Sequence, residues 1–273
     1  MTTPTHHTVA DLHVHTTVSD GRLEIEDIPK LAKRADLLAV GITDHDRIHP
    51  WFASPVTKHT GITLIRGIEL RVERDDGERF DLLGYAVEET AALRQLIDRI
   101  QTARVERAGR MIEAIETRLG IALEIDVGPG IGRPHIARAV AAHPDTPHTA
   151  IDVFQTLIGN GKPCYVSRWV PTLDQGISIL TDASKVVSLA HPLRYADVEG
   201  AIAIARRVGA IERWYPYEEA VSTEQIDGAV DQYDLLPTGG SDSHERTVGT
   251  TGVPRNVYES FANVCGIPTP SEP

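Results

Sequence analysis

The chain has 273 residues, 41% of them hydrophobic, which is enough to bury a substantial core as one large domain or as a domain with an insertion. This composition excludes a disordered or fibrous protein. A formal net charge of −12, from 39 acidic and 27 basic residues, repels polyanions, so the composition excludes a broad basic surface for extended duplex nucleic acid.

The sequence also indicates where the protein works. Residues 1–8 are polar and nowhere do 18 apolar residues run together, so we expect neither a signal peptide nor a membrane span. Cys164 and Cys265 lie far apart and outside any C-x-x-C spacing, which indicates structural thiols in a reducing compartment. We therefore expect a cytoplasmic protein without a membrane partner.

Strands and helices alternate in the first third of the chain. The apolar run at 37–43 is typical of a strand buried on both faces of a parallel sheet. Alternation of this kind predicts a β/α organisation. The predicted elements are a strand at 9–14, a helix at 23–35, and strands at 37–43, 63–70 and 80–86.

The pattern changes near Glu89. Apolar residues then recur at three- and four-residue spacing up to Leu119, which predicts one long helix or two in series. A short strand at 121–127 and helices at 134–142 and 150–158 follow. We interpret residues 90–162 as a mainly helical insertion.

Strand and helix alternation resumes after the insertion. The chain is therefore expected to have three parts, with barrel segments at 1–89 and 163–273 on either side of the insertion at 90–162. The predicted elements are helices at 173–181, 198–208 and 223–233 and strands at 186–190, 210–214 and 235–238.

Candidate metal ligands cluster at the ends of the predicted strands. His13 and His15 alternate along one strand and therefore share a face. In parallel β/α barrels the carboxyl ends of the strands meet at one face, where distant residues converge. The set contains nitrogen and carboxylate ligands without thiolates, and these suit Zn, Mn or Fe. The ligands are His13, His15, Asp20, His45, Glu69, His191, Asp242 and His244, more than one ion needs, so we infer two or three ions with Glu69 as a bridge.

Five ordered motifs also resemble a known family. They are His13-Val-His15 with Ser19-Asp-Gly21, Thr43-Asp-His-Asp46, Gly67-Ile-Glu69, Leu189-Ala-His-Pro192 and Gly240-Ser-Asp-Ser-His244. In this order they resemble the PHP (polymerase and histidinol phosphatase) family, and most closely its stand-alone phosphoesterase branch. Gly132-Arg-Pro-His135 and Gly161-Lys-Pro163 also resemble motifs of that branch.

The resemblance implies an α/β fold, a distorted (β/α)7 barrel with a helical insertion, and a trinuclear metal centre. It assigns His13, His15, Glu69 and Asp242 to one ion, Glu69 and His191 to a second, and Asp20, His45 and His244 to a third. One position departs from the family pattern, because Asp81 stands where a histidine is usual. Aspartate can still bind a metal, but it favours Mn or Fe and could leave the second site partly empty.

Arginines and a helix start are the candidates for substrate binding. Arg194 follows the strand that carries His191, and the planar guanidinium matches phosphate oxygens. Arg133 and His135 lie at a predicted helix N-terminus, which favours anions, and Arg107 belongs to a run of arginines on the long helix. Asp46 is a candidate proton carrier to the leaving group.

These residues favour a metal-dependent phosphoesterase acting on phosphate monoesters or on the 5′ end of small nucleotides or short oligonucleotides. Two alternatives stay open. One is a metal-containing binding or regulatory domain without catalysis, which only Asp81 favours. The other is an amidohydrolase-like C–N hydrolase, because those enzymes also begin with His-x-His on a barrel strand, although the Gly-Ser-Asp-Ser-His ending does not suit them.

Overall fold

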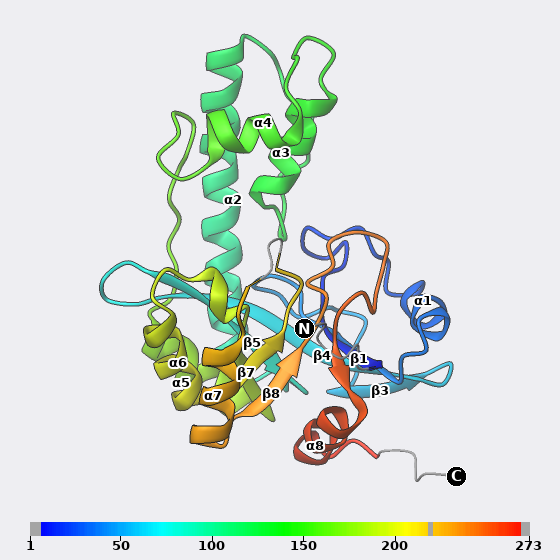
Figure 1. Ribbon diagram of the computed structural model, residues 1–273. Coiled ribbons are helices and arrows are strands. Elements are labelled where there is room, and N and C mark those ends of the chain that lie inside the picture. Colours follow the sequence, from blue (N-terminus) through cyan, green and yellow to red (C-terminus); the bar gives the residue numbers. More distant parts are fainter. Residues whose placement is uncertain (1–6, 218–220, 269–273) are drawn as a thin grey trace. The chain divides into compact units, whose positions relative to one another are not determined.

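A computed structural model of the chain describes residues 7–217 and 221–268 (Figure 1). Contacts between residues divide the chain into two compact units. Met1–Arg94 and Pro171–Pro273 form one, here called the barrel unit, and Gln95–Val170 forms the other, here called the insertion unit. These divisions lie five and eight residues beyond the boundaries expected from the sequence at 89/90 and 162/163.

The barrel unit is built on a nine-stranded sheet with the order β8-β7-β6-β5-β4-β2-β1-β9, and β3 pairs with β4. Val14 of β1 bridges to Ser243, just beyond β8, so the sheet curls into a nearly closed barrel. All seven strands predicted for the barrel segments are present, and β3 and β9 are additional short edge strands. The strands are β1 (Thr8–Val14), β2 (Ala39–Ile42), β3 (Val56–His59), β4 (Ile62–Glu73), β5 (Arg79–Tyr85), β6 (Val186–Leu189), β7 (Gly209–Trp214), β8 (Leu236–Gly239) and β9 (Val253–Pro254).

Strand β5 interrupts the parallel arrangement, since it runs antiparallel to both β4 and β6. The cause is a tight turn after β4, in which Gly77 has a φ of 87° and Arg74 N donates a hydrogen bond to Glu78 O over 2.8 Å. Short turns can join only antiparallel strands. The first residues of β5 therefore lie beside the carboxyl end of β4, where the candidate ligands gather.

Five α-helices of the barrel unit cover the sheet. In Figure 1, α5, α6 and α7 lie together against β5, β6 and β7. The first helix begins later than predicted, because Pro29 in its first turn cannot donate a backbone hydrogen bond and is favoured at a helix start. The helices are α1 (Ile28–Arg34), α5 (Leu173–Ala183), α6 (Val198–Val208), α7 (Glu224–Tyr233) and α8 (Arg255–Cys265), with a 3₁₀ turn at Pro192–Arg194.

The insertion unit is helical. Helix α2 (Ala91–Leu119) is a single 29-residue helix, followed by α3 (Arg133–Ala142), α4 (Ala150–Val153) and a π-helical turn at Phe154–Ile158. Met111, Ile136 and Leu157 belong to the unit's own apolar core. The predicted strand at 121–127 is wrong, because the described part of this unit contains no strand with which it could pair.

The barrel core surrounds the first strand. Val9, Ala10, Leu12 and Val14 of β1 are all at most 3% exposed, so this strand is buried on both faces. No helix in the described ranges is both long enough and apolar enough to cross a membrane.

Close packing of β1 on β2 generates a stability prediction. A Cβ atom on Gly41 would lie 2.6 Å from the carbonyl oxygen of Leu12, so Gly41→Ala must push two buried strands apart. We expect this substitution to lower the free energy of unfolding by about 1–3 kcal/mol in urea denaturation. Gly228→Ala in α7, where a Cβ meets nothing within 4 Å, is the control and should raise stability by up to about 1 kcal/mol. Equal effects of the two substitutions would contradict this packing.

Candidate metal centre

His13 and His15 reach the site from β1 and the residue just beyond it. The Cβ of any side chain at position 240 would lie 2.3 Å from His13 N, so Gly240 is what allows the end of β8 to approach β1. The following loop carries Asp20 and is held by Asp44, whose carboxylate accepts hydrogen bonds from Thr16 N and Oγ1 and from Ser19 Oγ. The loop geometry around Asp20 therefore depends on a buried carboxylate.

Three residues of the site have left-handed backbone conformations. The φ angles are 53° for Asp46, 33° for His191 and 48° for Asp242. Such conformations are uncommon for side chains larger than glycine and cluster at functional sites. Each follows a buried strand or strand end, so the backbone turns sharply where its side chain has to face the centre.

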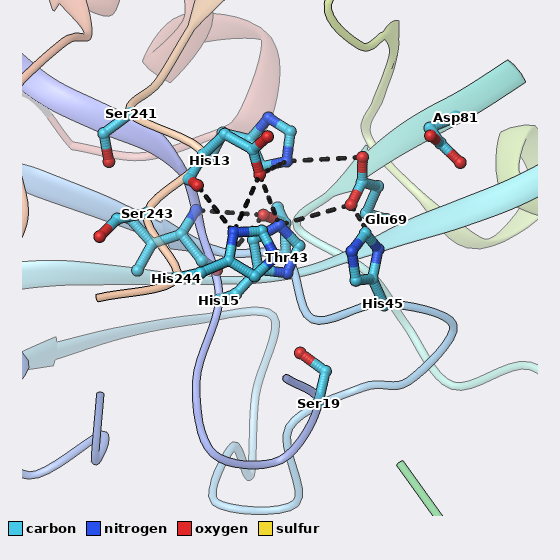
Figure 2. Close-up of polar contacts among 12 residues, drawn as sticks. His13, His15, Ser19, Thr43, His45, Glu69, Asp81, Ser241, Ser243 and His244 are labelled. Atoms are coloured by element: carbon cyan, nitrogen blue, oxygen red, sulfur yellow. Dashed lines mark hydrogen bonds and ion pairs between the residues drawn. The ribbon is translucent and has the colours of Figure 1, made fainter. Parts of the chain in front are cut away.

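The structure brings the nine candidate ligands of the sequence into three groups. In each group the ligand atoms lie within 4.8 Å of one another. The first group is His13, His15, Glu69 and Asp242; the second is Glu69, Asp81 and His191; the third is His15, Asp20, His45 and His244. Figure 2 shows His15, His45 and His244 gathered beside Glu69. Glu69 is shared by the first two groups, and His15 by the first and third.

The buried atoms that face the groups suit a cation. Within the described structure, His13 Nε2, both ring nitrogens of His15, Glu69 Oε2 and Asp242 Oδ1 are buried without a hydrogen-bond partner. Buried polar atoms are normally paired, and leaving them unpaired costs free energy. Imidazole nitrogens and carboxylate oxygens converging in this way are the donor set of Zn, Mn and Fe sites.

The protonation states also suit metal binding. Burial raises the pKa of Asp20, but His45 and His244 outweigh this effect and hold the pKa well below its ordinary value. Burial lowers the pKa of His15, and the neighbouring His244 and His45 lower it further. Metal ligands must be ionised carboxylates and neutral imidazoles. The Asp20 carboxylate and the His15 imidazole meet these conditions.

The pKa of His13 shifts in the opposite direction. Burial alone would lower this pKa, but Glu212, Asp242 and Glu69 together hold it well above the ordinary value. The imidazole therefore lies among three carboxylates that favour a cation. A metal ion bound at this position would take the place of the proton.

Sequence reasoning missed two buried carboxylates that position the ligands. Glu212 in β7 is fully buried and lies 2.9 Å from His13 Nδ1, and it accepts a hydrogen bond from His191 N over 2.7 Å. Asp11 in β1 accepts hydrogen bonds from Ser241 N and Oγ and from Gly249 N. Their signal in the sequence is an acidic residue inside a predicted barrel strand, because an acid in a buried strand is seldom without a partner.

Arg194 and Asp46, the two other candidates in the barrel unit, both lie near ligands. Arg194 Nη1 donates a hydrogen bond to Tyr215 Oη over 2.9 Å, and Tyr215 Oη donates to Asp242 Oδ2 over 2.9 Å. Asp46 is 1% exposed, and its backbone N donates to Glu69 O over 2.8 Å.

Arg107, Arg133 and His135 all belong to the insertion unit. The guanidinium groups of Arg107 and Arg133 each lie 5.9 Å from the ring centre of Tyr165. Burial, and after it the charges of Arg133, Arg168 and Arg104, lower the pKa of Arg107 to about 9. His135 Nδ1 accepts a hydrogen bond from Gly132 N over 3.1 Å at the start of α3. Positive charge therefore gathers around Arg107 in a protein of net negative charge.

Comparison with known proteins identifies the family. The PHP domain profile matches residues 11–150, just over half of the chain, and the chain belongs to the PHP domain family. A phosphoribosyl 1,2-cyclic phosphate 1,2-diphosphodiesterase of Eggerthella lenta is 25% identical over 86% of this chain and 94% of that protein. A 3′,5′-nucleoside bisphosphate phosphatase of Chromobacterium violaceum is 30% identical over 68% of this chain and 67% of that protein.

Further relatives are similar over smaller parts or in fold. A 5′-3′ exoribonuclease of Salmonella typhimurium is 29% identical over 68% of this chain, which spans 66% of that protein. The crystal structure of a candidate metal-dependent phosphoesterase from Bifidobacterium adolescentis superposes with a TM-score of 0.78 at 22% identity, covering 94% of this chain and 96% of that one. A sulfate-bound amidohydrolase of Chromobacterium violaceum gives a TM-score of 0.76 at 23% identity, covering 93% and 96%. These structures confirm the predicted barrel-like α/β fold.

The position of Glu212 generates a prediction about metal binding. Glu212→Gln keeps the shape of the side chain but leaves one acceptor oxygen where His13 and His191 each face a separate one, because the amide NH₂ can only donate. Partners of this kind commonly change metal affinity roughly 10–100-fold, and we expect a loss in that range by titration calorimetry with Mn²⁺. Glu259→Gln, on the exposed face of α8, is the control. Unchanged affinity of the Glu212 variant would show that Glu212 does not orient the ligands.

Proposed function

We propose that this protein is a metal-dependent phosphoesterase that hydrolyses phosphate monoesters or the 5′ end of small nucleotides and short oligonucleotides. The observation that carries the proposal is the set of three ligand groups, joined through Glu69 and His15, in a chain of the PHP domain family. The relatives named above are described as a phosphodiesterase, a phosphatase and an exoribonuclease, and all three of these activities break phosphate esters.

The proposed cofactors are two or three divalent ions, Mn, Fe or Zn. The first group would hold one ion, the second group with Asp81 another, and the third group the last. When bound, such ions supply a water molecule of lowered pKa and positive charge for the phosphoryl oxygens. Arg194 would bind those oxygens, because hydrogen bonds through Tyr215 connect its guanidinium to Asp242.

Other side chains would complete substrate binding and proton transfer. Arg107, Arg133 and His135 are proposed to bind anionic groups of the substrate, supported by the positive charge around Tyr165. Asp46 would donate a proton to the leaving group, and its carboxylate is fixed by a 3.1 Å hydrogen bond from Arg71 N.

A small substrate and a cytosolic location belong to the same proposal. The net charge of −12 opposes binding of an extended duplex, and the relatives' names refer to ribose phosphates, nucleotides and RNA ends. Cys164 and Cys265 are both buried as free thiols, which fits a reducing compartment.

The experiment that tests the function measures release of phosphate or of mononucleotides from a panel of substrates. Metal-free full-length protein is loaded with Mn²⁺, Fe²⁺ or Zn²⁺ and incubated with mononucleotides, nucleoside bisphosphates, short 5′-phosphorylated oligonucleotides and sugar phosphates. We expect release from at least one nucleotide class, abolished by EDTA and restored by metal. Bound metal without any release would favour the binding domain, and hydrolysis of C–N substrates alone would favour the amidohydrolase alternative.

The division of the ligands generates a second prediction. Asp20 belongs to the third group alone, so Asp20→Ala should remove one ion per chain while the ion between His13 and Asp242 remains. We expect kcat to fall roughly 100-fold or more, since each catalytic ion stabilises transition-state charge by several kcal/mol. Plasma mass spectrometry of dialysed protein counts the ions, with the exposed Asp75→Ala as control. Loss of every ion, or of none, would refute the division.

A further inference from the structure

Asp81 is already engaged by another residue of the barrel unit. Arg71 and Asp81 stand opposite each other in the β4–β5 ladder. Arg71 Nε donates a hydrogen bond to Asp81 Oδ1 over 2.7 Å, and Nη2 donates to Oδ2 over 2.6 Å. The planar guanidinium therefore occupies both carboxylate oxygens of a side chain that is only 5% exposed.

Arg71 is held in place from both ends. Its backbone N donates a hydrogen bond to Asp46 Oδ1 over 3.1 Å, while its side chain is fixed to Asp81. Asp81 N in turn donates to Tyr195 Oη over 2.9 Å. The carboxylate of Asp81 raises the pKa of Arg71 above its ordinary value, and Glu69 and Asp46 add smaller effects in the same direction. Arg71 is therefore a permanent positive charge beside the centre.

The second group is the poorest in ligands. It has three members where the other two groups have four, and Glu69 is shared with the first group. His191 Nε2 lies 3.1 Å from Glu69 Oε1 and 3.6 Å from Asp81 Oδ2. Of the three members, Glu69 is shared with the first group and Asp81 is paired with Arg71, so only His191 is neither shared nor paired with an arginine.

We propose that Arg71 competes with the metal ion of the second group for the Asp81 carboxylate, so that this ion is bound more weakly than those of the other two groups. The physical reason is twofold: the guanidinium already neutralises Asp81, and its fixed positive charge repels a nearby dication. Arg71 is a positioning residue that sets the occupancy of one site. The proposal rests on the metal centre proposed above.

The test counts bound ions without any substrate. Metal-free full-length protein is dialysed against increasing free Mn²⁺, and bound metal per chain is measured by plasma mass spectrometry. For the wild type we expect two ions at low free Mn²⁺ and a third only at a concentration about tenfold higher or more. Arg71→Gln removes the competing charge, and the third ion should then bind at about tenfold lower free Mn²⁺.

The same hairpin offers a matched control. Arg79 Nε donates to Glu73 Oε2 over 2.7 Å in an equivalent cross-strand pair, and neither residue belongs to a ligand group. Arg79→Gln should leave all binding steps unchanged. Arg71→Lys, which keeps the charge but cannot occupy both carboxylate oxygens, should shift the third step less than Arg71→Gln. It also serves as the second variant if loss of the Arg71–Asp81 pair unfolds the protein, as judged by circular dichroism.

The possible results separate this inference from the proposed function. A third step that weakens or does not move in the Arg71 variants overturns the competition. Wild-type protein that binds no ions overturns the metal centre and the competition together. If the third binding step shifts as expected but the protein hydrolyses no phosphate ester, the competition is supported and only the phosphoesterase activity is overturned.

Discussion

The buried carboxylate of Glu69 is the interaction on which the centre depends. Its side chain is 1% exposed, and its oxygens lie between 2.6 and 3.6 Å from ring nitrogens of His13, His15, His45 and His191. A buried anion is costly unless positive charge or hydrogen-bond donors surround it. The four imidazoles come from the ends of three different strands, so satisfying this one carboxylate fixes how those strands meet.

The extended β4–β5 hairpin makes the second ligand group different from the other two. Because β4 continues to Glu73, Glu69 lies four residues before the strand's end, and the antiparallel return along β5 brings Asp81 to the same edge. The same pairing places Arg71 opposite Asp81. A parallel crossover in place of this hairpin would not have brought Asp81 to this edge.

Three further buried carboxylates hold the ligands and their loops in position. Asp11 fastens the ends of β1 and β8 through Ser241, Asp44 fastens the loop that carries Asp20, and Glu212 orients His13. All three are at 0% exposure. Each accepts several hydrogen bonds, so the charges that would otherwise destabilise the barrel fix the geometry of its open edge.

The sequence by itself predicted the seven barrel strands and a helical stretch up to Leu119, because strand and helix periodicities are local properties of the chain. Strand ends and the family resemblance predicted the nine candidate ligands, and the structure alone decided that the helical stretch is the single helix α2. Only the tertiary structure decided that β5 runs antiparallel, that residues 121–127 form no strand, and that His15 belongs to two groups. It alone also revealed Glu212 and Arg71 as partners of His13 and Asp81. The reason is physical: Glu212 meets His13 across 199 positions of the chain, and such a contact depends on strand register, which no local pattern specifies.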